Sequence, residues 1–128
     1  MKKLALFAAA ATFAASAAFA ATMSATPTDS RTVTDYYKQA VYGPNQTKVG
    51  DVDDVLLNKD GKVTGLVIGV GGFLGINQKD VIVPFSDVKM EKKNDKWWLS
   101  IDATKDSLKS AQGFTYNHEN TMWEPDRS

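Results

Sequence analysis

The chain has 128 residues, in which 15 basic residues balance 15 acidic ones, and it contains no cysteine. This length allows one domain with a single core, and without disulfides that core must be stabilised by packing alone. The balanced charge supplies no electrostatic footprint for nucleic acid or for anionic lipid, so we expect neither as a partner.

Residues 1–20 have the features of a bacterial export signal. Lys2 and Lys3 give a positive start, and an apolar, alanine-rich stretch follows over residues 4–14. Ala18-Phe19-Ala20 then supplies small residues at the two positions that signal peptidase reads, which predicts cleavage after Ala20. An uncleaved anchor is the alternative, but alanine is only weakly hydrophobic, so no stable membrane insertion is expected after cleavage. We therefore expect a periplasmic protein, although the sequence does not exclude secretion outside the cell.

The segment after the signal predicts a flexible leader and then a short helix. Residues 21–33 are small and polar and are interrupted by Pro27, so they bury little apolar surface. Residues 34–41 favour a short helix or helical turn, with Thr34 as its N-cap. Gly43-Pro44-Asn45 is expected to end this helix as a turn.

Two long strands are predicted next. Residues 48–57 place valine and leucine among aspartates, and the alternation breaks at Asp53-Asp54, as a β-bulge would break it. Asp60-Gly61 is the strongest turn signal in the chain, and residues 63–70 return as the partner strand. The glycine-dense run that follows is interpreted as a sharp corner of the backbone. Its structural glycines are Gly69, Gly71, Gly72 and Gly75.

The remaining elements are shorter. Residues 81–83 predict a buried strand that ends at Pro84, because proline cannot donate to a strand ladder. Residues 86–92 and 96–101 predict a hairpin, and residues 104–111 predict a short capped helix. A closed or half-closed barrel buries both the faces and the edges of such short strands.

The predicted fold is therefore a mainly β domain over residues 34–116, a small β-barrel of five to six strands with short flanking helices. Residues 117–128 are expected to form a tail that packs on or near the barrel. Small barrels need such covers, because their own strands bury little apolar surface.

The central residues of the chain also resemble a known family, the PRC-barrel family. The similarity is carried by Lys48-Val49-Gly50-Asp51-Val52, by Val67-Ile68-Gly69-Val70-Gly71-Gly72-Phe73-Leu74-Gly75, and by Lys79-Asp80-Val81-Ile82-Val83-Pro84-Phe85. The resemblance implies a six-stranded barrel of roughly 80 residues that serves as an interaction module. The tail, with Trp123-Glu124-Pro125, is similar to that of small exported proteins of alpha-proteobacteria.

No catalytic, cofactor or metal site is predicted. The glycine run has one residue too many for G-x-G-x-x-G, and no helix or Lys-Ser/Thr pair follows it to hold a phosphate. Asp51, Asp53 and Asp54 lack the spacing of a calcium loop and are interpreted as solvated strand residues. His118 is the only histidine, and it lies in a polar stretch without a nucleophile motif. We therefore expect a protein that is not an enzyme.

Aromatic side chains supply the candidate contact surface, because aromatics dominate interface energetics. Its members are Tyr36, Tyr37, Trp97, Trp98 and Trp123. An alternative is that the tail, with Phe114, Tyr116 and Trp123, folds back and covers whichever of the two neighbouring tryptophans faces outward. The leading hypothesis is a non-enzymatic interaction module for an unknown protein partner or for a second copy in a homo-oligomer. The other hypothesis is a small-ligand or envelope-glycan binder that uses the aromatic set.

Overall fold

The computed structural model describes residues 21–71 and 77–127, and the contacts within the chain divide it into Met1–Ser30 and Arg31–Ser128. Residues 21–30 are exposed and contain no helix or strand. None of the helices in the described residues is both long enough and apolar enough to span a membrane. All elements named below belong to the second part of the chain.

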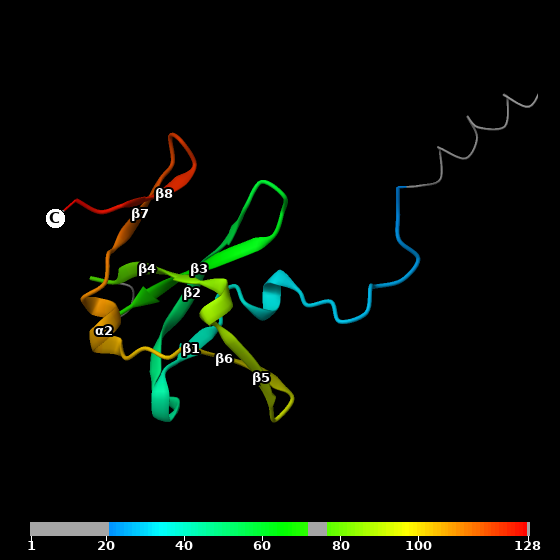
Figure 1. Cartoon of the computed structure of the whole chain (residues 1–128), viewed down its shortest axis with the longest axis horizontal. Helices are drawn as coiled ribbons and strands as arrows, with labels where there is room; N and C mark the ends of the chain where they lie inside the picture. Colours follow the sequence, from blue (N-terminus) through cyan, green and yellow to red (C-terminus); the bar gives the residue numbers. More distant parts are fainter. Residues whose placement is uncertain (1–20, 72–76, 128) are drawn as a thin grey trace, which may run out of the picture. The chain divides into compact units, whose positions relative to one another are not determined.

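Eight strands in the described residues form one sheet (Figure 1). In chain order they are β1 (Ala40–Tyr42), β2 (Lys48–Leu57), β3 (Val63–Val70), β4 (Lys79–Pro84), β5 (Lys89–Lys93), β6 (Lys96–Ser100), β7 (Phe114–Asn117) and β8 (Met122–Pro125). Across the sheet the order is β5-β6-β1-β2-β3-β4-β7-β8. Neighbouring strands are antiparallel except β1 and β6, which run parallel.

The long strands β2 and β3 confirm the prediction from the sequence, with the same bounds. Gly61 has a φ of +82° in the turn between them, a conformation that glycine adopts without strain. The pairing of β2 with β3 shifts register between Val52 and Asp54, so the predicted bulge is also confirmed. The bulge inserts one extra residue, and it thereby changes which side of the strand the following residues occupy.

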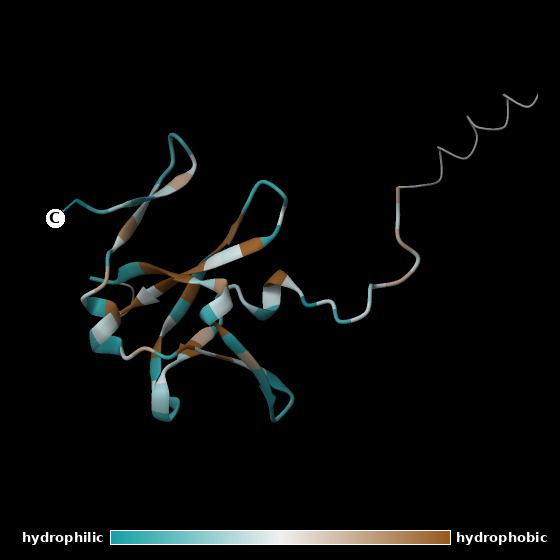
Figure 2. Ribbon diagram, in the orientation of Figure 1, coloured by the Kyte–Doolittle hydropathy of each residue, from teal (hydrophilic) through white to brown (hydrophobic). Residues whose placement is uncertain are grey.

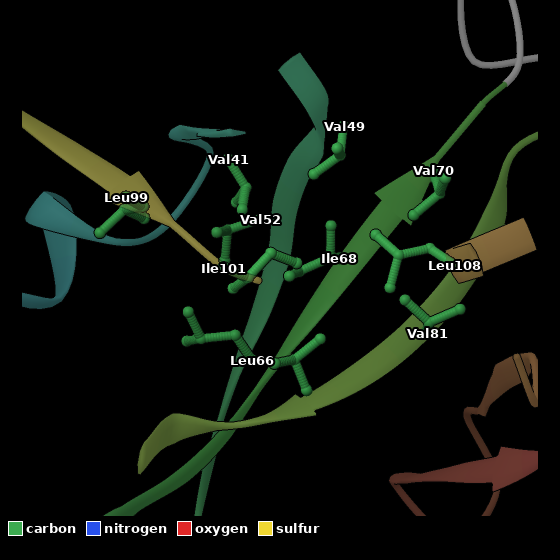
Figure 3. Packing of buried hydrophobic residues seen from close by; sticks show 11 residues of the cluster. Val41, Val49, Val52, Leu66, Ile68, Val70, Val81, Leu99, Ile101 and Leu108 are labelled. Carbon is green, nitrogen blue, oxygen red and sulfur yellow. The ribbon is translucent and has the colours of Figure 1, made fainter. Parts of the chain in front are cut away.

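The hydrophobic core lies against β2, β3 and β4 and is closed by residues from β1, β6 and the single α-helix of the described part, α2 (Lys105–Lys109) (Figure 3). Val41, Val52, Leu66, Ile68 and Leu99 are fully buried in it. Each such side chain contributes about 1.5–3 kcal/mol relative to leaving it exposed. Figure 2 shows the same distribution: hydrophobic residues concentrate on the central strands, and hydrophilic residues on the turns between them.

The predicted strand number and closure of the barrel differ from the structure. The sequence predicted five of the strands, β2 to β6, and missed three. One of these is β1, which overlaps the end of the predicted helix, and the other two are β7 and β8, which lie at the predicted domain end and in the tail. The sheet is also not closed, because β5 and β8 each have one strand neighbour among the described residues.

The predicted short helix or helical turn over residues 34–41 is present only as a helical turn at its start. A three-residue 3-10 turn, η2 (Val33–Asp35), occupies its start, and the N-cap is Thr32 instead of Thr34. The backbone then pairs with β2: the Lys38 N–H donates to the Val52 carbonyl and the Val52 N–H to the Gln39 carbonyl, each at 2.9 Å. Pairing with a neighbouring strand therefore overrides a weak local helical preference.

The end of the chain forms α2 and then a hairpin. Thr104 caps α2, as predicted, by accepting a hydrogen bond from the Ser107 N–H. The hairpin of β7 and β8 joins the sheet through the single pair Asp80–Phe114. In Figure 1 the β2–β3 and β7–β8 hairpins project to the same side of the view.

Candidate docking surface

The exposed large hydrophobic side chains gather in one place. Among the described residues from Arg31 onward they are Val33, Tyr37, Leu57 and Met122, which are between 42% and 60% exposed. Each of them lines one of two neighbouring grooves beside the hairpin end of β2. Scattered exposed hydrophobics are ordinary on a protein surface, but a contiguous set at a groove marks a binding site.

The first groove has a volume of about 320 Å³ and lies between β2 and η2. The second has a volume of about 490 Å³ and lies between the β2–β4 meander and the β7–β8 hairpin. Both are lined by Asp54, Val55 and Leu57, so they adjoin each other at β2. We refer to the two together as the apolar groove. Its walls are Val33, Tyr37, Asp54, Val55, Leu56, Leu57, Thr64, Ile82, Tyr116, Thr121, Met122 and Trp123.

Asp54 is the acidic group at the centre of the apolar groove. Its Oδ1 accepts a hydrogen bond from the Val55 N–H at 2.8 Å, and its Oδ2 accepts one from Trp123 Nε1 at 2.8 Å. The second bond attaches the β7–β8 hairpin to β2. Trp123 also packs edge-on against Tyr116, with ring centroids 5.5 Å apart, so the outer wall of the groove is held by both polar and apolar contacts.

The turn of the β7–β8 hairpin is organised by Glu124. Its carboxylate accepts hydrogen bonds from Asn117 Nδ2 at 3.0 Å and from Asn120 Nδ2 at 2.7 Å. These two bonds hold the pKa of Glu124 below its usual value, because they stabilise the charged form. The two bonds connect β7 and the turn of the hairpin to β8.

A carboxyl pair lies on β2 and β4 next to the groove. Gln78 Nε2 donates to Asp53 Oδ2 at 2.5 Å and to Asp80 Oδ1 at 3.1 Å, so one amide bridges two carboxyl groups. Partial burial, followed by the hydrogen bond and negative charge of Asp80, raises the pKa of Asp53 to about 7. The pair can therefore hold a proton near neutral pH, which Asp53 alone would release.

The bridge between the two carboxyl groups needs a glycine beneath it. A Cβ added to Gly69 would collide with the Gln78 amide and lie 2.6 Å from Asp53 Oδ2. The nearby Gly71 has a φ of +76°, which favours glycine. Gly72 and Gly75, and with them most of the predicted corner, lie outside the described residues.

The predicted aromatic set does not form one surface. Tyr37 and Trp123 line the apolar groove. Tyr36 packs edge-on against Phe85 and contacts the core. Trp97 lies under the Arg31 guanidinium, 4.2 Å from its ring centroid, and Trp98 stacks on Tyr42 at 4.4 Å. The tail residue Trp123 therefore contacts Asp54 on β2, while other residues cover Trp97 and Trp98.

Sequence reasoning missed the aliphatic members of the groove. Leu57 and Val33 were assigned to a strand end and to the leader, and Met122 received no role. A signal was present for Leu57, because it is an apolar residue at the last position of a strand, next to a polar turn, where a core can no longer cover it. Nothing comparable distinguishes Val33, since its position depends on how the chain folds back beside β2.

The structure places the other candidate residues as follows. His118 is exposed and packs edge-on against Tyr116. Asp51 forms a surface ion pair with Lys48 at 2.9 Å. Within residues 21–71 and 77–127, no three His, Cys, Asp or Glu side chains are grouped so that they could hold a metal ion.

Comparison with known proteins gives a single family. A family model described as the PRC-barrel domain matches residues 29–108, which is more than half of the chain. No curated protein matches the chain. The matched range contains β1 to β6 and ends before β7. The first part of the apolar groove therefore lies within the matched domain, and the second part forms where that domain meets an additional hairpin.

Proposed function

The chain belongs to the PRC-barrel family, and we propose that it is a non-enzymatic periplasmic module that binds a protein partner through the apolar groove. The observation that carries the proposal is the gathering of Val33, Tyr37, Leu57 and Met122 beside one strand. Apolar side chains left in water at one place gain free energy when a partner covers them, at about 25 cal/mol per Å² of apolar surface.

The test is recovery of a partner from periplasm by the protein and by two variants. Leu57→Lys replaces an apolar contact of the groove with a charged group and should abolish recovery, since covering the groove would then require removing water from an ammonium. Ser110→Lys adds the same charge at the exposed end of α2, where a cation is compatible with the helix dipole, and should leave recovery unchanged. Equal recovery with Leu57→Lys and with the unaltered protein would count against the groove.

Export is part of the same proposal and is tested separately. The signal features of residues 1–20 support cleavage after Ala20. The intact mass of the protein isolated from periplasm should correspond to a chain that begins at Ala21. A mass that includes Met1, or recovery only from the cytoplasm, would contradict this assignment.

A second candidate function is binding of a small polar ligand, such as an envelope glycan. The observation in its favour is a hollow of about 180 Å³ beside the Tyr42–Trp98 stack, with Asn45, Gln46 and Glu91 among its lining residues. Aromatic faces next to polar groups suit such ligands, but the volume is below the usual range of ligand pockets. The candidate function would be supported if adding a glycan changed the tryptophan fluorescence of the unaltered protein but not that of the Trp98→Leu variant. Unchanged fluorescence across a glycan panel would dismiss it.

A further inference from the structure

The apolar groove runs along a stretch of β2 that has a strand on one side only. Residues Asp54, Val55, Leu56 and Leu57 pair with β3. On the opposite side β1 pairs only as far as Asp51, and the hydrogen bonds to Val52 end the ladder. Lys38, with a φ of +68°, ends this pairing, and the preceding residues Val33 and Tyr37 line the groove beside Val55 and Leu57 without forming a strand. No described strand pairs with the remaining edge.

This free edge has backbone groups available for pairing. The N–H and carbonyl of Val52 point toward the β1 side, where they bond to Gln39 and Lys38. Because the bulge inserts one residue after Val52, alternation of the backbone returns the N–H of Val55 and then that of Leu57 to this same side. The Val55 N–H donates to Asp54 Oδ1, so the carboxylate of Asp54 occupies a donor that another strand could otherwise use.

The free edge also has apolar space on both faces of the sheet. Val55 packs against the core side and, with Leu57 and Tyr37, lines the groove next to η2. Leu56 points to the other face and lines the groove next to Ile82 and Met122. A strand placed beside β2 would direct its alternate side chains into these two spaces. Recognition by strand addition requires this combination of a free edge and pockets for alternate residues.

Three occupants are compared by charge: a second copy of the chain, its own residues 21–30, and a segment of another protein. Among the described residues that line the apolar groove, Asp54 is the only carboxylate, and none is a lysine, arginine or histidine. A second copy of the chain paired through this edge would bring two Asp54 carboxylates together in an apolar setting, which is unfavourable. The exposed segment of residues 21–30 contains Asp29 and no basic residue. A foreign segment with a lysine or arginine complements the groove instead.

We propose that the groove binds an extended segment of another protein as an added strand beside Asp54–Leu57. The segment carries apolar residues at alternate positions on both faces and a lysine or arginine that pairs with Asp54. The basic group draws the carboxylate away from the Val55 N–H, which frees that donor for the added strand. This inference rests on the proposed function and specifies the chemistry and the conformation of the partner.

The test begins with selection of random ten-residue peptides on the full chain. The expected result is enrichment of peptides that contain a lysine or arginine among β-branched or aromatic residues. Selection on Asp54→Lys should instead enrich aspartate or glutamate at the same place, whereas selection on Asp60→Lys, a matched charge reversal in the exposed β2–β3 turn, should reproduce the original pattern. The same peptides enriched on all three proteins would overturn the charge assignment.

The second measurement is amide hydrogen exchange with a synthetic copy of the most enriched peptide. Strand addition should slow exchange at Val55 and Leu57 by about tenfold or more, while the amides of α2 keep their rates. The peptide could instead bind in a way that Leu57→Lys abolishes without protecting these amides. That outcome would overturn strand addition and leave the proposed function standing. No enrichment above the Leu57→Lys background would overturn the peptide partner, while recovery of a folded partner from periplasm would still support the groove. Protection without peptide, accompanied by a dimer in sedimentation, would assign the edge to a second copy and also overturn the inference.

Discussion

At the residue scale, the neighbouring carboxylates Asp53 and Asp54, at the bulge of β2, have different partners. Asp53 joins Gln78 and Asp80 in the carboxyl pair, and Asp54 lies in the apolar groove. In a regular strand the two side chains would alternate between opposite faces. The extra residue at this point also decides which backbone groups of β2 remain free.

The raised pKa of Asp53 predicts a pH dependence of stability. Its value of about 7 in the folded protein compares with 3.8 for an ordinary aspartate, so between these values the folded state binds more protons than the unfolded state. This contribution is fully present below about pH 4 and is lost as pH rises through about 7. Because the site is partly open to solvent, we expect the loss to be about 1–2 kcal/mol.

Asp53→Asn should remove that dependence. Urea unfolding at several pH values should show the variant gaining stability relative to the unaltered protein as pH rises from about 4 to 7. Asp60→Asn, at an exposed turn position, should show no such relative gain. Parallel stability curves for Asp53→Asn and the unaltered protein would contradict the assignment.

Gly50, which the sequence did not single out, lies close to the backbone of β3, whereas Gly69 lies close to a side chain. A Cβ at Gly50 would collide with the backbone carbonyl oxygen of Gly69 and lie 2.9 Å from Ile68 Cγ2. Backbone cannot move aside as a flexible side chain can, so Gly50→Ala should destabilise the fold by about 2–3 kcal/mol. Gly65→Ala, whose Cβ would lie 3.2 Å or more from its neighbours, should cost less. Thermal unfolding midpoints distinguish the two variants. Equal midpoints would show that β2 and β3 can move apart enough to accommodate a Cβ at Gly50.

At the element scale, the β7–β8 hairpin depends on few attachments. It joins β4 through one residue pair, and Trp123 adds the hydrogen bond to Asp54. Gln112 and Gly113 fasten the end of β8 by bonds to the backbone of Asp126 at 2.9 and 2.8 Å. The hairpin is thus the element in which a single contact has the largest consequence for the shape of the groove.

Trp123→Phe should loosen this hairpin and leave the rest of the sheet intact. The change keeps most of the aromatic packing on Tyr116 but removes the donor to Asp54, at a cost of about 1–2 kcal/mol. Amide exchange of Tyr116 and Trp123 should accelerate about tenfold, while that of Leu66 and Ile68 in β3 stays the same. Uniform acceleration in all strands would indicate that the hairpin is part of the global folding unit.

The elements also show where sequence reasoning succeeds and fails. The strands β2 and β3 and their turn were predicted with correct bounds, because alternation, a bulge and Asp60-Gly61 are local signals. The strand β1 was missed, since its three residues become a strand only through pairing with β2 and β6. The aromatic residues were recognised as contact candidates, but the aliphatic groove around two of them depends on segments that are distant in sequence.

At the scale of the whole molecule, the open sheet leaves edges that need protection. The edge strand β5 carries Lys89, Lys92 and Lys93, and β8 ends at Pro125, which limits pairing between copies. The free edge of β2 carries the charge of Asp54. Under the proposed strand addition, this charge is expected to disfavour pairing between copies and to favour a basic partner.

Replacing Asp54 should therefore promote self-association. Asp54→Val makes the groove uniformly apolar and should give a concentration-dependent dimer in sedimentation, whereas the unaltered protein stays monomeric. Asp60→Val removes an equal charge at an exposed turn and serves as the control. A stable dimer of the unaltered protein at micromolar concentration would show that Asp54 does not guard this edge.

The sequence by itself determined the mainly β class, the central hairpin with its bulge, the capped helix α2 and the similarity to PRC-barrel domains, because these depend on patterns within a few consecutive residues. Only the tertiary structure decided that β1 is a strand, that the sheet stays open, and that Val33, Leu57 and Met122 meet around Asp54. These features arise from pairing and packing between segments up to about 90 residues apart. No local pattern encodes them.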